Sequence, residues 1–414
     1  MNDCKDQVGM NSAPDETALA ALVADIRTEA KRLGFSQIAI SDVHLGAAEA
    51  GLQRWLDAGF QGEMGYMARH GSKRARPAEL VPGTLRVITV RMDYLPAHAS
   101  SSLATEPPTT APLEAATAAV DWREAEWASL ADPQAAVVSV YARGRDYHKV
   151  LRSRLQKLAD YIASRTDPGV VRVFTDSAPV LEVALAARAG LGWRGKHTLL
   201  LDREAGSMFF LGELFIGLPL PVDAPQQEHC GSCSRCIDVC PTRAIVAPYT
   251  LDARRCIAYL TIELTGSIPE DLRPLMGNRV YGCDDCQLVC PWNKYAQTSS
   301  LPDFAPRHAL NSSGLLQLWA WSETDFLQRT EGSAVRRIGF ERFRRNLAVA
   351  LGNARRSLPA AHALQQAIET ALHVGLVDAT PLVAEHIRWA LTRAPGTTGS
   401  DLSDSLHQAQ EHGQ

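Results

Sequence analysis

The residues with the clearest chemical potential in this sequence are eight of its nine cysteines, which lie between positions 230 and 290. Four of them form a C-x2-C-x2-C-x3-C-P run that ends at Pro241, and three form a C-x2-C-x3-C-P run that ends at Pro291. The first spacing is typical of bacterial ferredoxins, in which three cysteines bind one 4Fe–4S cluster and the fourth binds the neighbouring cluster. The sequence therefore predicts two 4Fe–4S clusters.

This rule divides the eight cysteines into two complete sets of ligands. The ligands of cluster one would be Cys230, Cys233, Cys236 and Cys290. The ligands of cluster two would be Cys240, Cys256, Cys283 and Cys286. Zinc is the alternative, but zinc sites built from two C-x2-C pairs usually separate them by roughly a dozen residues or more. Neither cysteine run contains a histidine, and the ninth cysteine, Cys4, is expected to be an idle thiol.

Length and charge place the chain among intracellular proteins of several domains. Its 414 residues predict two or three domains, and its net charge of −4 gives no overall sign of nucleic-acid binding. The polar N-terminus lacks the apolar core of a signal peptide. The longest apolar stretch, 208–222, contains Glu213 and two prolines, so it does not predict a membrane span. We expect a cytoplasmic protein without a membrane partner, able to act as a monomer.

Hydrophobic periodicity predicts an α/β domain before the cysteines and a helical region after them. Helices are expected at 17–33, 47–58, 147–164 and 179–189, and strands at 37–40, 86–90, 135–140, 170–174, 198–201 and 208–216. Residues 96–119, rich in Ala, Ser, Thr and Pro, predict a mobile insertion. The expected domains are 1–225, a ferredoxin-like module at 226–294, and a tail at 295–414. The tail has five expected helices, at 314–321, 323–329, 339–351, 360–374 and 381–393, which suggest a HEAT-like helical repeat.

Several strings spread over the chain resemble epoxyqueuosine reductases, which complete queuosine synthesis in tRNA. They are Gly59-Phe60 through Tyr66-Met67, the string from Tyr141 to Lys149, Asp176-Ser-Ala-Pro-Val, the string from Gly190 to His197, the string from Tyr281 to Asn293, and Arg337-Ile-Gly339. The resemblance covers residues 17–389. It implies that the protein reduces the epoxide of epoxyqueuosine at the wobble position of tRNA, with electrons from a donor that the residues do not identify.

The resemblance also implies a cobalamin cofactor, held in a nitroreductase-like α/β domain. Residues in the matching strings or on the strands that follow have side chains or main-chain groups suited to a corrin. These cobalamin-contact candidates are Arg69, Tyr141, His148, Asp176, Lys196, His197, Leu200 and Leu211.

Asp176 is the expected proton donor, because the acid of the family lies in the same Asp-Ser-Ala-Pro string. The epoxide oxygen leaves poorly as an alkoxide, so an acid must protonate it. At neutral pH this role predicts that burial raises the pKa of Asp176. The alternative is that Asp176 caps a helix that begins near Pro179.

Arginines in the tail are the expected contact with the tRNA anticodon stem-loop, because the guanidinium fork binds phosphate in a bidentate manner. The predicted tRNA contacts are Arg336, Arg337, Arg344 and Arg345; Arg342, Arg355 and Arg356 belong to the same run. One departure from the family is Val183, where an arginine is usual, so the arginine contact is either lost or moved to Arg188.

Two other functions share parts of this pattern. A reductive dehalogenase would use the same two cofactors on a small organohalide, but it would have no use for the arginines of the tail. An electron carrier would need the clusters and no cobalamin. Cobalamin content would separate the carrier from the enzymes, and the substrate would separate the two enzymes.

Overall fold

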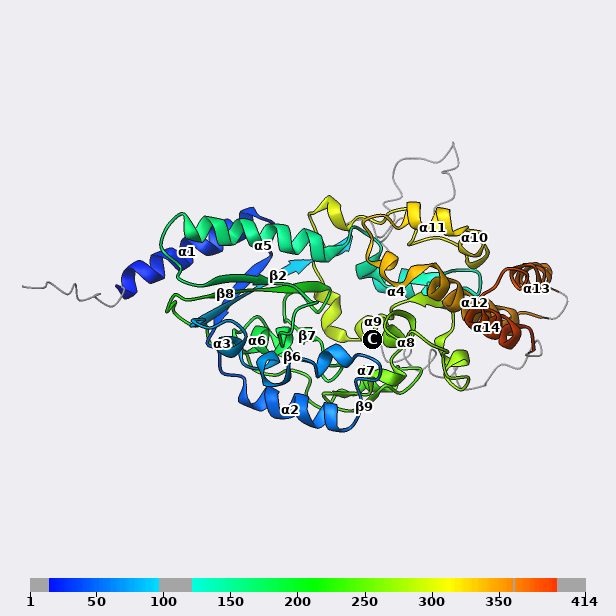
Figure 1. Cartoon of the computed structure of the whole chain (residues 1–414), viewed down its shortest axis with the longest axis horizontal. Helices are drawn as coiled ribbons and strands as arrows, with labels where there is room; N and C mark the ends of the chain where they lie inside the picture. The colour runs from blue at the N-terminus through cyan, green and yellow to red at the C-terminus, as the bar shows by residue number, and fades with distance from the viewer. Residues whose placement is uncertain (1–14, 97–120, 360–361, 393–414) are drawn as a thin grey trace, which may run out of the picture.

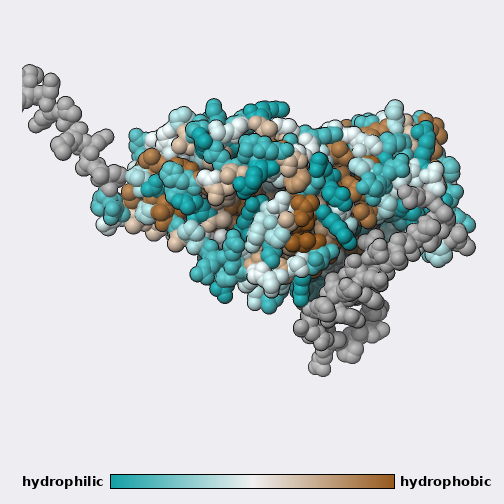
Figure 2. Space-filling model, turned by 90° about the horizontal axis from the view of Figure 1, so that it is seen from below, coloured by the Kyte–Doolittle hydropathy of each residue, from teal (hydrophilic) through white to brown (hydrophobic). Residues whose placement is uncertain are grey.

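The structure is a computed structural model that describes residues 15–96, 121–359 and 362–392. The predicted insertion at 96–119 lies outside these ranges except for Pro96. Within the described residues, no helix is long and apolar enough to cross a membrane. The face shown in Figure 2 is largely hydrophilic, with apolar side chains gathered near its middle and in smaller groups toward both ends.

A four-stranded antiparallel sheet forms the centre of the first half of the chain, with the strand order β1-β2-β8-β5. Its strands are β1 (Gln37–Ser41), β2 (Arg86–Asp93), β8 (Phe209–Ile216) and β5 (Val171–Phe174). The inner strands β2 and β8 are almost entirely buried, and β8 has an almost continuous apolar sequence, whereas β2 also contains Arg86, Thr89, Arg91 and Asp93. The sheet therefore needs a cover on both faces.

Helices cover the two faces of the sheet (Figure 1). The helices α1 (Glu16–Arg32) and α5 (Tyr147–Ala163) lie on one face, and α6 (Glu182–Arg188) packs against β2 and β8 on the other. Asp15 and Asp146 begin α1 and α5, because each carboxylate accepts a hydrogen bond from a main-chain N–H of the first turn. The remaining elements of this half are α2 (Gly46–Asp57), α3 (Pro77–Leu80), β3 (Leu95–Pro96), α4 (Trp122–Ala131), β4 (Val137–Val138), β6 (Trp193–Arg194) and β7 (Leu200–Leu201).

Two expectations for this half are wrong in detail. The strand expected at 135–140 is only the two-residue β4, and it pairs with Arg279–Tyr281 (β11) rather than with the main sheet. The helix expected at 179–189 begins at Glu182, because Leu181 and the residues before it form an extended loop. Asp176 lies at the start of this loop, just after β5 ends at Phe174. The other predicted helices and strands of this half are confirmed, with bounds that shift by up to three residues.

The cysteine segment folds into short helices and strands. The helices α7 (Arg235–Asp238) and α9 (Asp285–Leu288) pack together, each inside one cysteine run. The other elements of the segment are β9 (Ile245–Ala247), β10 (Thr250–Leu251) and α8 (Ile257–Ile262). A short strand, β12 (Thr298–Ser299), pairs with β3. The pairing of β11 with β4 thus joins the cysteine segment to the first half of the chain. The pairing of β12 with β3 joins the residues that follow the cysteine segment to the same half.

The tail is helical, as predicted, and is organised around one long buried helix. The helix α12 (Gly339–Ser357) packs on α10 (Leu315–Trp319), α13 (Ala363–Gly375) and α14 (Pro381–Thr392). In sequence, α11 (Glu323–Arg329) lies between α10 and α12, and it begins with a reciprocal capping box of Ser322 and Asp325. The burial of α12 decides which of its arginines can meet a partner.

Candidate active site

A cavity of about 420 Å³ lies between α6, the strands β7 and β8, and the cysteine segment. Asp176 and Glu182 line it from one side. Four cysteines line it from the other side: Cys240, Cys256, Cys283 and Cys286. The cavity thus brings carboxyl groups together with soft thiolate ligands, which suits a redox step coupled to proton transfer.

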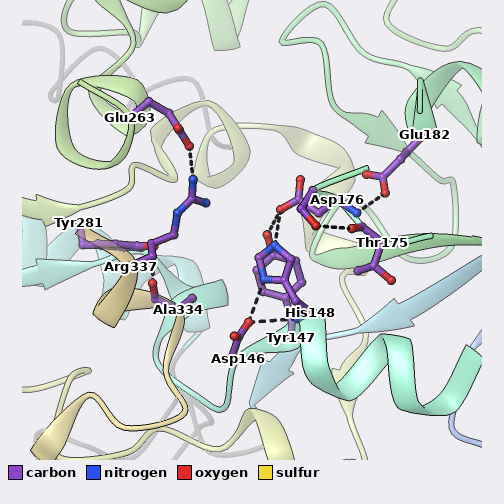
Figure 3. A network of polar contacts seen from close by, with 11 residues as sticks. Asp146, Tyr147, His148, Thr175, Asp176, Glu182, Glu263, Tyr281, Ala334 and Arg337 are labelled. Carbon is purple, nitrogen blue, oxygen red and sulfur yellow. Dashed lines mark hydrogen bonds and ion pairs between the residues drawn. The ribbon is translucent and has the colours of Figure 1, made fainter. Parts of the chain in front are cut away.

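The carboxylate of Asp176 accepts hydrogen bonds from two residues at the start of α5. Tyr147 donates its hydroxyl, and the Nε2 atom of His148 lies 3.0 Å from Oδ2 of Asp176. The other ring nitrogen of His148, Nδ1, lies 2.8 Å from Asp146. Figure 3 shows these residues as one continuous chain of polar contacts. A proton on His148 therefore lies between two carboxylates.

These contacts set the protonation states at neutral pH. Burial alone would raise the pKa of Asp176, but the hydrogen bonds from His148 and Tyr147 outweigh burial and lower it. Burial likewise opposes the charge on His148, but the bonds to Asp146 and Asp176 raise its pKa to about 9. The expected rise in the pKa of Asp176 is therefore wrong: the proton resides on His148, adjacent to an ionised Asp176.

Helix capping does not explain Asp176. The helix α6 begins after Leu181, and no side chain caps its first turn. The carboxylate of Asp176 instead points toward α5, and 45 % of its side chain remains accessible at the cavity. Its contacts suit an acid that faces a substrate.

The two predicted sets of cysteines line two separate cavities. Cys230, Cys233, Cys236 and Cys290 line a smaller cavity of about 270 Å³. The other four cysteines line the larger cavity, next to Asp176. This arrangement agrees with the division made from the motif spacing, including the exchange of Cys240 and Cys290 between the runs.

The structure brings most of the predicted cobalamin contacts together. Tyr141, His197, Leu200 and Leu211 line the larger cavity, as Asp176 does. The buried His197 accepts a hydrogen bond from the N–H of Leu199 through Nδ1, and its Nε2 atom has no partner among the described residues. Burial lowers the pKa of His197 to about 4, so its ring is neutral and available to a ligand.

Three of the predicted contacts lie elsewhere. Arg69 is exposed and is not among the residues that line the cavity. Lys196 lines the smaller cavity, where its ammonium donates to the main-chain carbonyls of Gly231 and Cys233. His148 reaches the larger cavity only through Asp176. Proximity in sequence was not sufficient, because Lys196 lines only the smaller cavity whereas the adjacent His197 lines both.

Sequence reasoning missed Tyr147, Glu182 and Glu213. Tyr147 and Glu182 lie within or beside the recognised strings, so their position was an available signal. Glu213 gave one signal, a single carboxylate inside an apolar strand, which sequence reasoning used only to exclude a membrane span. In the structure it is fully buried on β8.

The arginines of the tail divide into buried and exposed residues. Arg345 is fully buried and donates to the main-chain carbonyls of Leu260, Leu264 and Gly266. Arg344 lies over the ring of Trp319, with its guanidinium carbon 3.4 Å from the ring centroid. The prediction that Arg345 contacts tRNA is therefore wrong, because its guanidinium is used inside the protein, and Arg344 is largely committed to packing.

Arg336 and Arg337 remain exposed on the turn before α12. Arg337 forms an ion pair with Glu263 at 2.6 Å, and Figure 3 shows this pair opposite Asp176. Its charge also contributes to the low pKa of Asp176. An exposed cation thus lies at the edge of the candidate site.

The arginine that the family usually has at position 183 is not replaced by Arg188. Val183 lines the larger cavity and packs against the apolar cluster under α6. Arg188 forms a bidentate ion pair with Asp42. No arginine is among the described residues that line this cavity.

Two family models match parts of the chain. One, described as "4Fe-4S double cluster binding domain", matches residues 229–293, and the other, described as "Epoxyqueuosine reductase QueG, DUF1730", matches residues 74–177. The epoxyqueuosine reductase of Burkholderia pseudomallei is 58 % identical over 393 residues, which cover 92 % of this chain and 94 % of that protein. The chain belongs to the epoxyqueuosine reductase family. The family's member in Escherichia coli is 52 % identical over 91 % of this chain and 90 % of its own length.

Solved structures give the same result. A crystal structure of epoxyqueuosine reductase with an epoxyqueuosine-modified tRNA-Tyr stem loop has a TM-score of 0.75 at 26 % identity, and covers 96 % of this chain and 95 % of its own. A structure of the Bacillus subtilis enzyme has a TM-score of 0.74 at 26 % identity and covers 95 % of each chain. It is described as having its catalytic aspartate loop swung out of the active site.

Proposed function

We propose that this protein reduces the epoxide of epoxyqueuosine at the wobble position of tRNA and so forms queuosine. The observation that carries this proposal is the position of Asp176, which shares one cavity with the cysteines of a double-cluster domain in a chain of this family. Removing the epoxide oxygen as water takes two electrons and two protons. The cysteine segment accounts for the electrons, and the chain from Asp146 to Asp176 for the first proton.

Two 4Fe–4S clusters fit the cysteine segment. We infer that the smaller cavity holds the cluster bound by Cys230, Cys233, Cys236 and Cys290. The larger cavity would hold the second cluster, bound by Cys240, Cys256, Cys283 and Cys286, on the side that faces Asp176. Electrons would therefore enter at the cavity farther from Asp176.

The residues that line the larger cavity would also suit cobalamin, which would be held there near Asp176. The cavity wall combines apolar side chains, such as Leu200 and Leu211, with an unpartnered Nε2 atom of His197. Such a mixture suits a large ring that carries amide groups. When bound there, cobalamin would supply a strongly reducing centre that takes single electrons from the cluster.

The protein's own residues prepare the proton. His148 carries it at neutral pH and donates through Nε2 to Asp176, while Asp146 fixes the ring through Nδ1. Asp176, which faces the cavity, would relay the proton of His148 to the leaving oxygen, which leaves Asp176 ionised and His148 neutral. Solvent would return a proton to His148, and the same relay would supply the second proton that completes water. This order keeps the acid ionised until negative charge develops on the substrate.

We further propose that the tRNA stem-loop approaches past Arg336 and Arg337. Both are exposed, and Arg337 lies near enough to Asp176 to affect its charge. The Asp176 loop, residues 175–181, would correspond to the loop described as swung out in the Bacillus subtilis enzyme and would likewise be able to leave the site.

The finer description of the domains is also a proposal. We assign residues 1–225 to a nitroreductase-like cobalamin domain, 226–294 to the ferredoxin-like module and 295–414 to a HEAT-like tail. The sheet covered by α1, α5 and α6 and the packing of α12 on its neighbours support this division.

Reconstitution tests the proposal directly. Anaerobically purified protein, loaded with cobalamin and given a chemical reductant, should convert an epoxyqueuosine-containing stem-loop to queuosine. Omission of cobalamin should abolish this conversion. Conversion at the same rate without cobalamin would contradict the cofactor assignment, and reduction of a small organohalide in place of the stem-loop would favour a dehalogenase.

A further inference from the structure

The carboxyl groups of Glu182 and Glu213 lie close to Asp176 and have no part in the proton chain described above. Glu213 lies midway along β8, with Thr89 of β2 and Phe174 of β5 as its partners in register. Its side chain is 0 % exposed, and neither carboxyl oxygen has a hydrogen-bond donor among the described residues. An ionised carboxylate in such a position is very unfavourable, so Glu213 must carry a proton.

Glu182, the first residue of α6, faces Glu213. Burial, and then the charge of Asp176, raise the pKa of Glu182 to about 8. Burial, and then Glu182 itself, raise the pKa of Glu213 well above its usual range. At neutral pH the pair is therefore largely protonated and can share a hydrogen bond, which supplies the donor that Glu213 lacks. The other groups that act on Glu182 are Tyr147, His148 and Arg74.

Glu182 also holds the main chain of Asp176. The N–H of Asp176 donates to Oε1 of Glu182 at 2.6 Å. Asp176 has a φ of 42°, a left-handed conformation that is strained for a residue with a Cβ atom. Such a conformation persists only where its surroundings hold it, and Figure 3 shows Asp176 between Glu182 and the His148–Tyr147 pair. The acid is thus fixed from both sides.

We propose that Glu182, supported by Glu213, is the positioning residue that keeps the Asp176 loop turned into the cavity. The inference rests on the proposed function, in which Asp176 must reach the substrate. Glu182 accepts the N–H whether it is protonated or ionised, so the bond does not depend on its charge. Glu213 acts only through Glu182, because β8 places it behind that residue.

The test compares Glu182→Ala with Glu182→Gln, since glutamine keeps the oxygen that accepts the N–H of Asp176. Misplacing an acid costs on the order of 10- to 100-fold in rate, so Glu182→Ala should lower kcat by that factor, with an unchanged KM for the stem-loop. Glu182→Gln should retain near wild-type kcat. Hydrogen–deuterium exchange of peptide 174–182 should be faster in the alanine variant and unchanged in the glutamine variant.

Three controls make the result specific. Glu124→Ala, on the exposed face of α4, should change neither kcat nor exchange. Glu213→Gln should slow turnover less than Glu182→Ala and add nothing to it in the double variant, because residues that act through one another are not additive. Iron content and Tm verify folding. If the Glu182→Ala variant does not fold, Glu182→Met replaces it, with the same expected loss of kcat and the same faster exchange.

Wild-type kcat and exchange in Glu182→Ala would overturn the inference, as would a glutamine variant impaired as severely as alanine. Failure of the wild-type protein to reduce the stem-loop would overturn the proposed function instead. The exchange measurement needs no substrate, so it tests the role of Glu182 separately.

Discussion

At the scale of single residues, the chemistry depends on where one proton resides. Tyr147 and His148 stabilise the ionised form of Asp176, and Asp146 stabilises the charged form of His148. In the proposed mechanism the acid is therefore a set of linked groups rather than one carboxyl with a raised pKa. Among these groups, Asp176 is the one that faces the cavity, and His148 is the one that carries the proton at neutral pH.

Asp176→Asn tests the last member of the chain. Asparagine keeps the size of aspartate and can accept the hydrogen bonds from Tyr147 and His148, but it cannot pass on a carboxyl proton. The variant should fold and keep both clusters, yet lose turnover by about 10²-fold or more. Turnover, iron content and Tm should be measured on the same preparation. Near-normal turnover would assign the proton to water or to a neighbour such as Tyr141 or His197.

The pH dependence tests His148. Because the folded pKa of His148 is raised to about 9, its proton is present at pH 7 and is lost as pH rises through about 9. The kcat of the wild-type protein should fall over that range, and His148→Gln should be slow at all pH values and lack this fall. The Glu182→Gln variant should keep the fall of kcat at about pH 9. A fall centred near 8 that disappears in Glu182→Gln would assign the dependence to the Glu182–Glu213 pair.

At the scale of elements, the turn before α12 exposes two arginines, Arg336 and Arg337, whereas Arg345 on α12 itself is buried. Arg336→Ala with Arg337→Ala should weaken stem-loop binding and flatten its dependence on salt, because fewer counterions are released. Binding measured at several salt concentrations checks this expectation. Arg203→Ala with Arg235→Ala removes the same charge from the first half and the cysteine segment, and should leave the slope unchanged.

An unchanged salt slope in the Arg336 and Arg337 variant would place the tRNA surface elsewhere. Arg345→Ala should behave differently from that variant. It would leave three main-chain carbonyls without their donor, so it should lower Tm and not selectively reduce binding.

Local patterns predicted much of the fold and the centre of the site. The division of the cysteines rests on the fixed spacing of cluster ligands, and the role of Asp176 rests on a recognised string. Both agree with the lining of the cavities and remain predictions. The role of Arg345 was not predictable, since a run of arginines does not say which face of α12 is buried. The strand expected at 135–140 failed because its partner, β11, lies more than a hundred residues away. The burial of Glu213 beside Glu182 depends on the packing of β2, β5, β8 and α6, and no local sequence pattern predicts that packing.

At the scale of the whole molecule, the proposed path for electrons runs from the smaller cysteine cavity to the larger one, which Asp176 also lines. Anaerobically prepared protein should therefore carry about eight iron and eight sulfide per chain, because each of two cubanes holds four of each. Cys256→Ser should damage one cluster, and Cys4→Ser should leave the iron content unchanged. Four iron per chain, or stoichiometric zinc, would contradict the assignment of the cysteines.

The central claim is that this chain completes queuosine synthesis, with Asp176 as its acid. Nucleoside analysis of tRNA from cells that lack the protein tests this claim most directly. Epoxyqueuosine should accumulate in place of queuosine, and a gene copy of the wild type, but not of Asp176→Asn, should restore queuosine. A normal queuosine content in cells without the protein and without another such reductase would contradict the account.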